Sequence, residues 1–256
     1  MILLFLFGLF IGSFLNMLID RLPRVEQILS GRSHCDNCHK PIAWYDLIPV
    51  VSWLLLRGRC RWCRKKIPVR NVVVEMVTGS LFGFTFYAQS MGQMSQMNQL
   101  ELVAQLMIVS CLIVIFFVDL QHQIIPDSMI LIASLAAVGL YFLRTYPVSP
   151  LPYLLSALGA AGFFALLILI TRGAGMGWGD VKFAAFMGLF LGFPGTITAL
   201  YFAFLTGAFV SVTLILRGKK RFGQTIAFGP FLVAATILVW YGELLGVWLL
   251  YFPYII

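Results

Sequence analysis

The chain has 256 residues, of which 61% are hydrophobic and 11% charged, and its mean hydropathy is +0.94. This composition is far more apolar than that of soluble domains, so it excludes an ordinary soluble enzyme and predicts an all-α polytopic membrane protein. The net charge is +8, but no nucleic-acid-binding motif accompanies the basic residues, so nucleic acid is not an expected partner.

Eight apolar segments are candidates for membrane-spanning helices, because a span needs about 20 mostly apolar residues, or fewer inside a bundle. They cover residues 1–20, 71–89, 100–118, 128–143, 151–171, 181–193, 195–216 and 225–250. The first segment lacks a basic N-terminal region and a small-residue cleavage site, which indicates a retained anchor rather than a signal peptide. The sixth is the weakest candidate, since it is short and ends at a Gly-Phe-Pro-Gly turn.

The basic residues predict the orientation in the membrane, because short cytoplasmic loops collect Lys and Arg. Eleven of the 18 basic residues lie in 21–70, and four more lie in 217–221. Eight spans with the N-terminus outside place both loops in the cytoplasm and leave only Arg144 outside. The favoured explanation of this positive charge is that it only sets the orientation and contacts anionic lipid headgroups. The alternative is that it binds a specific acidic partner.

Residues 23–70 are the one polar segment long enough to form a small domain. The chain is therefore predicted to comprise a first transmembrane helix at 1–22, a cytoplasmic loop domain at 23–70 and a membrane domain at 71–256. The loop contains two CxxC pairs, formed by Cys35, Cys38, Cys60 and Cys63. Two such pairs can complete a tetrahedral tetrathiolate site, which suits a structural zinc ion.

The cysteines allow two interpretations other than a zinc site. The CDNCH sequence at 35–39 matches a haem-attachment pattern, but attachment requires an extracytoplasmic compartment and leaves the second cysteine pair unused. Disulfides are disfavoured because the predicted topology places all four thiols in a reducing compartment. Zinc remains the favoured ligand.

Two of the ten acidic residues stand at membrane edges on the same predicted side of the bilayer. Asp119 ends the third span, and Asp180 opens the sixth in GMGWGDVK. If the two carboxyl groups approach each other, one can activate water while the other, protonated, polarises a peptide carbonyl and then protonates the leaving amine. The pattern alone favours the simpler interpretation that both are ordinary interfacial acids, with Asp180 stabilised by a helix N-terminus, because structural ion pairs also place acids at such sites.

The residues around these acids suggest supporting roles. Gly173, Gly175, Gly177 and Gly179 are expected to adopt backbone geometries closed to other residues and to leave a slot for an extended peptide. Glu75 and Asn16 lie inside spans, so pairing within the bundle is favoured, with direct contact to substrate as the alternative. Asp127 is interpreted as a helix cap, and Lys182 either tunes Asp180 or extends toward the headgroups.

At these residues the chain resembles the bacterial prepilin peptidases, the type IV leader peptidase family of GxGD-type intramembrane aspartyl proteases. The resemblance covers nearly the full chain and depends on the order and spacing of several motifs. These are GSFLNMLIDRLPR at 12–24, the paired CxxC, YDLIPVVSWLLLRGRC at 45–60, VRNVVVEMVTG at 69–79, FVDLQHQIIPD at 117–127, GMGWGDVK at 175–182 and AFGPFL at 227–232.

The resemblance implies that Asp119 and Asp180 form the catalytic pair of an enzyme of the bacterial inner membrane. Such enzymes cleave basic leader peptides from type IV prepilins and pseudopilins after a glycine, at the cytoplasmic face. Many also methylate the new N-terminus with S-adenosylmethionine, and the zinc loop is typical of these bifunctional members. Gly58 lies in the motif that the resemblance associates with methyl transfer. Leu47 and the Val69–Asn71 step depart from the family pattern, and they bear on methylation rather than cleavage.

Two functions from other classes compete with this interpretation. A proton-coupled transporter could use Asp119 and Asp180 as a relay, but transporter acids tend to lie near the midplane within repeated halves, and the sequence shows no internal repeat. A noncatalytic, zinc-stabilised scaffold would tolerate replacement of both aspartates.

Overall fold

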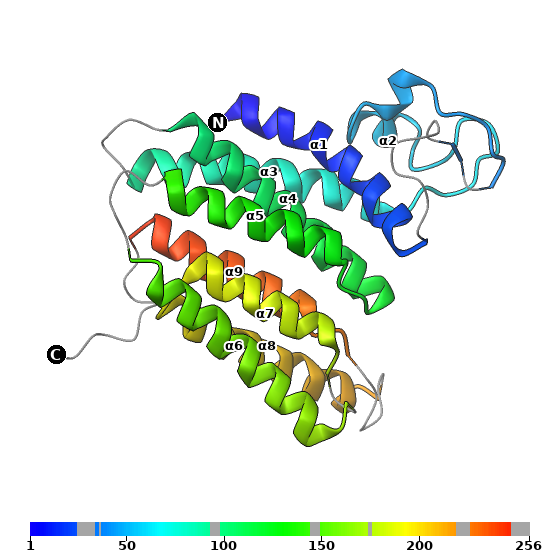
Figure 1. The fold of residues 1–256 in the computed structure, drawn as a ribbon. Coiled ribbons are helices and arrows are strands. Elements are labelled where there is room, and N and C mark those ends of the chain that lie inside the picture. Colours follow the sequence, from blue (N-terminus) through cyan, green and yellow to red (C-terminus); the bar gives the residue numbers. More distant parts are fainter. Residues whose placement is uncertain are drawn as a thin grey trace. The chain divides into compact units, whose positions relative to one another are not determined.

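The computed structural model describes residues 1–24, 34–35, 37–92, 98–143, 149–173, 176–218 and 226–246. The chain divides into two compact units, Met1–Tyr87 and Ala88–Ile256. The described residues are predominantly helical and contain no β-strand, only two isolated β-bridges (Figure 1). The predicted all-α class is therefore confirmed for this part of the chain.

The first unit is built on two helices, α1 (Ile2–Arg21) and α3 (Val69–Gly92), with the short elements η1 (Leu22–Arg24), η2 (Trp44–Leu47) and α2 (Val51–Leu55) between them. Glycines let α1 approach α3 closely. A Cβ atom at Gly12 would lie 2.6 Å from Glu75 Cα, and one at Gly8 would lie 2.7 Å from Gly79 Cα. Small residues at such contacts allow two membrane helices to pack backbone against backbone.

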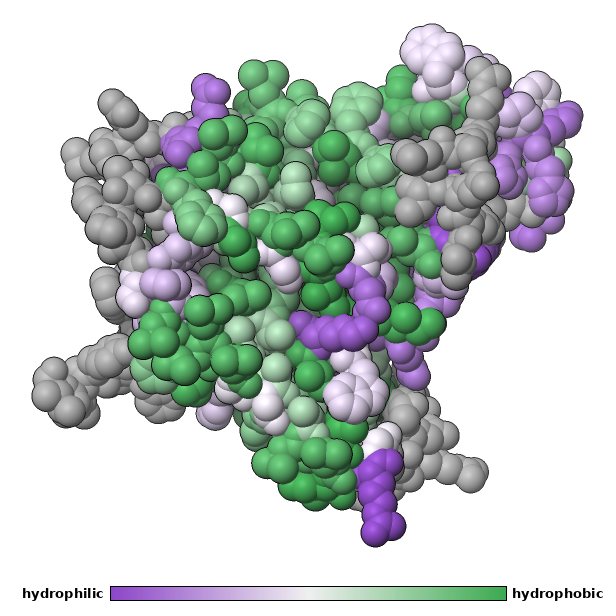
Figure 2. Space-filling model, in the orientation of Figure 1, coloured by the Kyte–Doolittle hydropathy of each residue, from purple (hydrophilic) through white to green (hydrophobic). Residues whose placement is uncertain are grey.

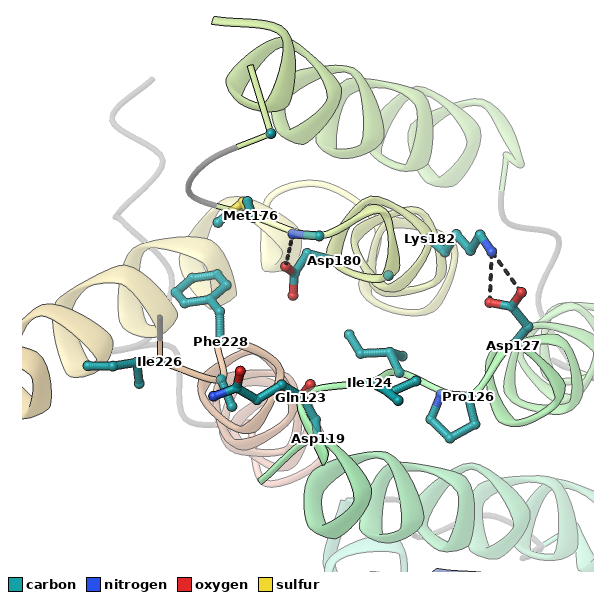
Figure 3. Close-up of a pocket in the computed structure, with 15 residues that line it drawn as sticks. Asp119, Gln123, Ile124, Pro126, Asp127, Met176, Asp180, Lys182, Ile226 and Phe228 are labelled. Atoms are coloured by element: carbon teal, nitrogen blue, oxygen red, sulfur yellow. Dashed lines mark hydrogen bonds and ion pairs between the residues drawn. The ribbon is translucent and has the colours of Figure 1, made fainter. Parts of the chain in front are cut away.

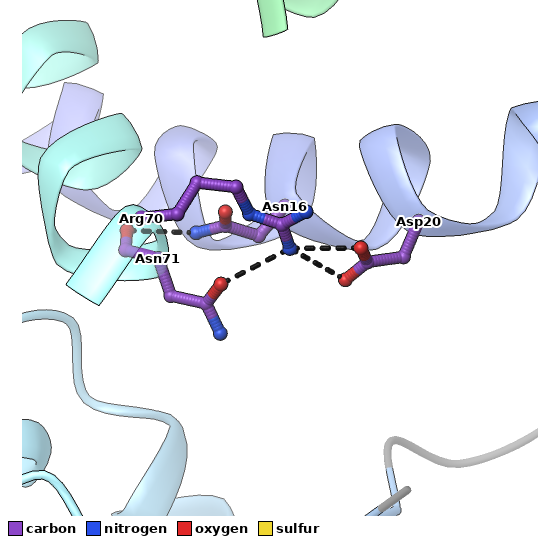
Figure 4. Close-up of polar contacts among 4 residues, drawn as sticks. All are labelled: Asn16, Asp20, Arg70 and Asn71. Atoms are coloured by element: carbon purple, nitrogen blue, oxygen red, sulfur yellow. Dashed lines mark hydrogen bonds and ion pairs between the residues drawn. The ribbon is translucent and has the colours of Figure 1, made fainter. Parts of the chain in front are cut away.

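A polar cluster joins the C-terminal end of α1 to the start of α3 (Figure 4). Arg70 Nη2 donates to both carboxylate oxygens of Asp20 at 2.8 and 2.9 Å, and to Asn71 Oδ1 at 3.1 Å. Asn16 Nδ2 donates to the carbonyl oxygen of Asn71 at 2.9 Å. The cluster therefore gives Asn16 a partner within the helix pair, as a polar residue in a membrane helix requires.

The second unit is a bundle in which α7 contacts four other helices, and α4 packs against α5 and α9. In Figure 1 the α7 helix lies between α5 and α6. The helices of the second unit are α4 (Gln99–His122), α5 (Asp127–Leu143), α6 (Leu151–Thr171), α7 (Trp178–Leu191), α8 (Gly195–Leu216) and α9 (Gly229–Leu244). Of these, α4 is buried along most of its length, while α6 and α8 expose much of their apolar surface.

Hydrophobic side chains cover much of the helical surface, as expected of helices that face lipid (Figure 2). All eight predicted spans coincide with helices, but only four helices of the described chain are long and apolar enough to cross a membrane. They are Ile2–Arg24, Gln99–His122, Leu151–Thr171 and Gly195–Leu216. The multi-pass class is thus supported, and the count of eight crossings is not confirmed.

Of the remaining helices, α3 has 24 residues but is less apolar than those four, so the predicted span 71–89 is not among them. The helices at the other three predicted spans are shorter than a full span. The α5, α7 and α9 helices have 17, 14 and 16 residues, so each requires capping turns inside the bundle to serve as a crossing. The predicted eighth span, 225–250, is observed as α9, and its two ends lie outside the described residues. Arg144 and 219–221, which contribute to the predicted orientation, also lie outside them, and the orientation stays a prediction.

Gly188 marks the closest contact between α7 and α6, because a Cβ atom there would overlap the backbone N and Cα of Ala157. We expect Gly188→Ala to lower the free energy of unfolding by about 1–3 kcal/mol, the usual cost of overpacking. Thermal unfolding in detergent measures this loss. The control is Gly162→Ala in α6, where a Cβ atom meets nothing within 4 Å. Equal melting temperatures for the two variants would contradict the close contact.

Candidate functional site

A pocket of about 660 Å³ in the second unit contains both predicted catalytic aspartates. It lies between the C-terminal end of α4, the start of α5, the start of α7 and the start of α9 (Figure 3). Its lining consists of Asp119, Gln123–Asp127, Gly173, Met176, Gly177, Gly179, Asp180, Lys182 and Ile226–Phe228. The pocket therefore combines two buried acids with apolar walls and a charged rim.

Asp119 lies in the last turn of α4, and only 5% of the residue is exposed. The helix ends just beyond it because Gln123 adopts a left-handed conformation with φ of 55°, and its N–H donates to the Asp119 carbonyl oxygen at 2.9 Å. The carboxyl group lies against the start of α9, since a Cβ atom at Gly229 would lie 2.6 Å from Asp119 Oδ2. Gly229 is thus a residue of the site that the sequence analysis did not single out. The sequence does contain a signal for the start of α9, the Gly-Pro pair at 229–230, because proline is common at the first positions of a helix.

Asp180 lies in the first turn of α7, and 8% of the residue is exposed. Gly177 occupies the N-cap position, and its N–H donates to Asp180 Oδ2 at 3.2 Å. A carboxylate in this position is stabilised by the unpaired N–H groups and the dipole of its own helix. In Figure 3 the Asp180 and Asp119 side chains extend into the same pocket from α7 and α4.

The glycines before Asp180 differ from one another in their roles. Gly173 has a left-handed φ of 76°, as predicted, whereas Gly177 has φ of −93°, which any residue can adopt. The prediction of a restricted backbone geometry is therefore wrong for Gly177. At Gly179 the constraint is space, because a Cβ atom would lie 3.1 Å from the Cβ of Ile125. Gly175 lies outside the described residues.

An ion pair joins α5 and α7 at the pocket rim. Lys182 Nζ lies 2.8 Å from each carboxylate oxygen of Asp127, and both side chains are exposed. Asp127 is the first residue of α5, so the predicted helix start is observed. Its carboxylate pairs with Lys182 of the neighbouring helix, so the predicted role as a helix cap is not what the structure shows. The Lys182 ammonium group pairs with Asp127, so the geometry does not support direct electrostatic tuning of Asp180 by this lysine.

In the first unit, the four predicted zinc ligands come together. All four Sγ atoms lie within 4.8 Å of one another, and Cys35 Sγ lies 3.8 Å from Cys63 Sγ. Tetrahedral zinc with Zn–S bonds near 2.3 Å separates its sulfur ligands by about 3.8 Å. The cysteines form no disulfide. Cys35, Cys38, Cys60 and Cys63 could therefore hold one metal ion, and their chemistry suits zinc.

The two CxxC pairs sit on equivalent turns. The His39 N–H donates to the Cys35 carbonyl oxygen at 2.8 Å, and the Arg64 N–H donates to the Cys60 carbonyl oxygen at 3.0 Å. His39 and Arg64 both have left-handed conformations, with φ of 53° and 59°. Matched turns of this kind aim both thiols of each pair toward a common centre.

Hydrogen bonds distinguish the thiols of this cluster. A hydrogen bond from the Lys65 backbone N–H lowers the pKa of the Cys63 thiol to about 6, against the opposing effect of desolvation. The matching bond from Lys40 also lowers the pKa of Cys38, but desolvation and hydrogen bonds with the other cysteines raise it to about 11. The backbone N–H groups of Lys40 and Lys65 therefore both favour the thiolate form, which is the form that binds a metal ion.

Two further predicted residues have structural contacts in the first unit. Glu75 is buried in α3, and its Oε2 accepts a hydrogen bond from the Val50 N–H at 2.7 Å. Gly58 has φ of 66°, and a Cβ atom there would lie 2.8 Å from Cζ2 of Trp53. Gly58 also accepts a backbone hydrogen bond from Ile67 at 2.8 Å. Both residues therefore hold the loop domain together, and a role for Gly58 in methyl transfer stays a prediction.

Two family profiles match the chain. The bacterial Peptidase A24 N-terminal domain matches residues 6–89, and the type IV leader peptidase family matches residues 106–212. The second match includes both aspartates and the Lys182–Asp127 ion pair, and it ends before Gly229.

Curated relatives named prepilin leader peptidase/N-methyltransferase match over most of the chain. The protein from Myxococcus xanthus is 35% identical over 87% of this chain, and the match spans 65% of that relative's length. The Bacillus subtilis protein is 32% identical over 94% of both chains. The Aeromonas hydrophila protein is 32% identical over 97% of this chain and 93% of its own. No solved structure shows significant similarity to the chain.

Proposed function

Because this chain belongs to the type IV leader peptidase family, we propose that it is a membrane-embedded aspartic endopeptidase that removes the leader peptides of prepilins or pseudopilins after a glycine. The observation that carries the proposal is that Asp119 and Asp180, from separate helices, line one pocket. A transporter that uses these acids as a relay is not favoured, since the matched relatives are named as peptidases.

The proposed mechanism uses the two buried carboxyl groups as a pair. Two carboxyl groups that share one space favour retention of one proton, because like charges repel in a poorly solvated pocket. The ionised carboxylate removes a proton from water as the water attacks the scissile carbonyl carbon. The protonated carboxyl donates a hydrogen bond to the carbonyl oxygen and subsequently a proton to the leaving amine.

The walls of the pocket suit an extended peptide. Ile124 and Pro126 continue from α4 toward α5, and Met176 and Phe228 lie on the other sides of the opening. These apolar side chains offer contacts that are largely independent of substrate sequence. A glycine before the scissile bond fits the proposal, since a residue without a side chain allows its backbone to approach the carboxyl pair.

We further propose that the new N-terminus is methylated with S-adenosylmethionine as the donor, which the names of the relatives support. In this proposal Cys35, Cys38, Cys60 and Cys63 bind a structural zinc ion that stabilises the loop domain 23–70. In the sequence this domain follows the first helix, 1–22, and precedes the protease domain, 71–256. The N-terminus lies outside the inner membrane, and the loop domain and the aspartate pocket face the cytoplasm.

The proposed function is tested with the purified full chain in lipid nanodiscs and a synthetic peptide that contains a leader, a glycine and an apolar segment. Mass spectrometry should detect cleavage after the glycine and, with S-adenosylmethionine present, one added methyl group at the new N-terminus. An intact peptide at high enzyme concentration would reject the peptidase. Cleavage without methyl transfer would reject the second activity alone. A matched peptide with valine in place of the glycine serves as control.

Gly229→Ala tests the contact between α9 and Asp119. The added Cβ atom would lie 2.6 Å from Asp119 Oδ2, so the carboxyl group must move, and a displacement near 1 Å can cost about 10²-fold in rate. We therefore expect a fall in kcat of about 10- to 100-fold with little change in KM. The control is Gly139→Ala in α5, where a Cβ atom meets nothing within 4 Å. An unchanged kcat in a folded Gly229→Ala protein would show that the Asp119 carboxyl group does not pack against Gly229.

A further inference from the structure

An exposed apolar segment interrupts the basic loop domain. It runs from Trp44 to Leu55 and comprises η2, a turn and α2. Trp44 and Leu55 are each 78% exposed, and Leu54 is 61% exposed. Leu47, Ile48 and Val51 are also exposed. So many large apolar side chains in water are unusual for a small domain and indicate a surface that is covered by another apolar phase.

This segment is held in a defined position, so its exposure does not result from a loose loop. The Val50 N–H donates to Glu75 Oε2 in α3 at 2.7 Å. Ser13 of α1 contributes a side-chain hydrogen bond to the same carboxylate. At its other end, Asp46 accepts two hydrogen bonds from Arg61, at 2.6 and 2.8 Å. The segment is thus fixed both to the helix pair and to the second cysteine turn.

The attachment to Glu75 places the segment beside α3 and α1, and α1 is long and apolar enough to cross a membrane. Asn71 belongs to the polar cluster that joins α1 and α3, and Glu75 lies four residues further into α3, about 6 Å along the helix axis. A polar cluster at the end of two apolar helices marks the level of the headgroups. The turn that contacts Glu75 therefore lies at this level or slightly deeper, against the two helices rather than away from them.

The charges next to the segment complement an anionic lipid surface. Arg57 and Arg59 follow α2 directly, and both are exposed. Tryptophan, which begins the segment, concentrates at membrane interfaces because its ring is amphipathic. Apolar side chains flanked by arginine are typical of segments that lie in the interface plane, with their apolar face about 5–10 Å deep in the headgroup region.

We propose that Trp44–Leu55 is an interfacial anchor, whose exposed apolar side chains insert into the bilayer beside α1 and α3 while Arg57 and Arg59 contact the phosphates of anionic phospholipids. The loop domain is then a membrane-surface domain rather than one suspended in the cytoplasm. The anchor holds the cysteine cluster at a fixed height above the bilayer. The proposal is independent of the chemistry assigned to Asp119 and Asp180.

Fluorescence quenching tests the anchor in the full chain. The protein is placed in nanodiscs of phosphatidylcholine and phosphatidylglycerol, with and without bromine on the acyl chains. The emission of Trp44 is obtained as the difference between the wild type and Trp44→Phe, which keeps an apolar ring. The control is Trp62→Phe, because Trp62 is also exposed but lies on the second cysteine turn, with Lys40 Nζ 4.5 Å from its ring centre.

We expect brominated lipid to quench Trp44 at least about twofold more than Trp62, and aqueous iodide to show the reverse order. Removing phosphatidylglycerol should weaken the lipid quenching of Trp44, and Arg57→Gln with Arg59→Gln should reproduce that loss. Quenching of Trp44 by iodide but not by brominated lipid would overturn the proposal, since the segment would be in water. Protection from both quenchers would also overturn it, because protein would then cover the segment.

Discussion

Asp119→Asn and Asp180→Asn are each expected to lower the rate of leader removal by at least about 10³-fold, within the range that general acid–base groups contribute. Asparagine keeps the size of each side chain but can neither remove a proton from water nor supply one to the leaving amine. Because the two carboxyl groups act as a unit, the double variant should be little slower than either single variant. Single-turnover cleavage of the leader peptide measures all three rates.

The matched control is Asp127→Asn, which removes a carboxylate from the same pocket without touching the proposed pair. Asp127 is exposed and bonded to Lys182, so we expect its loss to change the rate by less than about tenfold, as for other surface ion pairs. Near-normal cleavage by folded Asp119→Asn or Asp180→Asn would reject the aspartic mechanism. Binding of substrate by these variants should persist, and a fluorescent peptide can measure it.

Loss of the cysteine cluster is expected to unfold the loop domain. Structural zinc in small domains supplies about 10–16 kcal/mol of apparent binding free energy, which is also folding free energy. The purified protein should contain about one zinc ion per chain, and Cys35→Ser with Cys60→Ser should remove it. Limited proteolysis should then cleave within 37–68, whereas the same region should stay intact in the wild type. Metal analysis and the pattern of fragments measure the two effects.

Cys111→Ser is the control for the cysteine variants. Cys111 is buried in α4 and does not belong to the metal-binding group. Its replacement should leave zinc content and the pattern of proteolysis unchanged. Wild-type protein without zinc, or a double variant that retains it, would exclude the proposed metal site.

Long apolar helices are the elements that the sequence predicts best. The predicted spans 151–171 and 195–216 coincide with α6 and α8, because uninterrupted apolar runs bounded by proline and glycine define both ends. The α7 helix starts at Trp178, three residues earlier than predicted. The glycine-rich sequence before it indicates a loop, but Gly177 occupies the N-cap position and the helix begins directly after it. The η2 and α2 elements were not predicted, as segments of four or five residues carry too little periodicity.

In the candidate site, the residues that belong to short sequence motifs could be predicted, and the contacts between distant helices could not. Local motifs single out Asp119, Asp180 and the four cysteines: each aspartate stands in a short motif of its own, and the cysteines form two CxxC pairs. The contact of Gly229 with Asp119 depends on how α9 packs against α4, and no local pattern encodes that packing. Likewise, the partner of Lys182 depends on the approach of α5 to α7. Such contacts require the tertiary structure.

The Lys182–Asp127 ion pair makes ionic strength a variable of any kinetic comparison. Both groups are exposed at the rim, so dissolved ions weaken their attraction, and the screening length is about 8 Å at physiological salt. Buried carboxyl groups in the same pocket are screened far less. Raising the salt concentration should therefore weaken the ion pair that joins α5 and α7 at the rim. It should leave the interaction of the two buried aspartates nearly intact. A change of rate with salt would then report on the rim and not on the cleavage step.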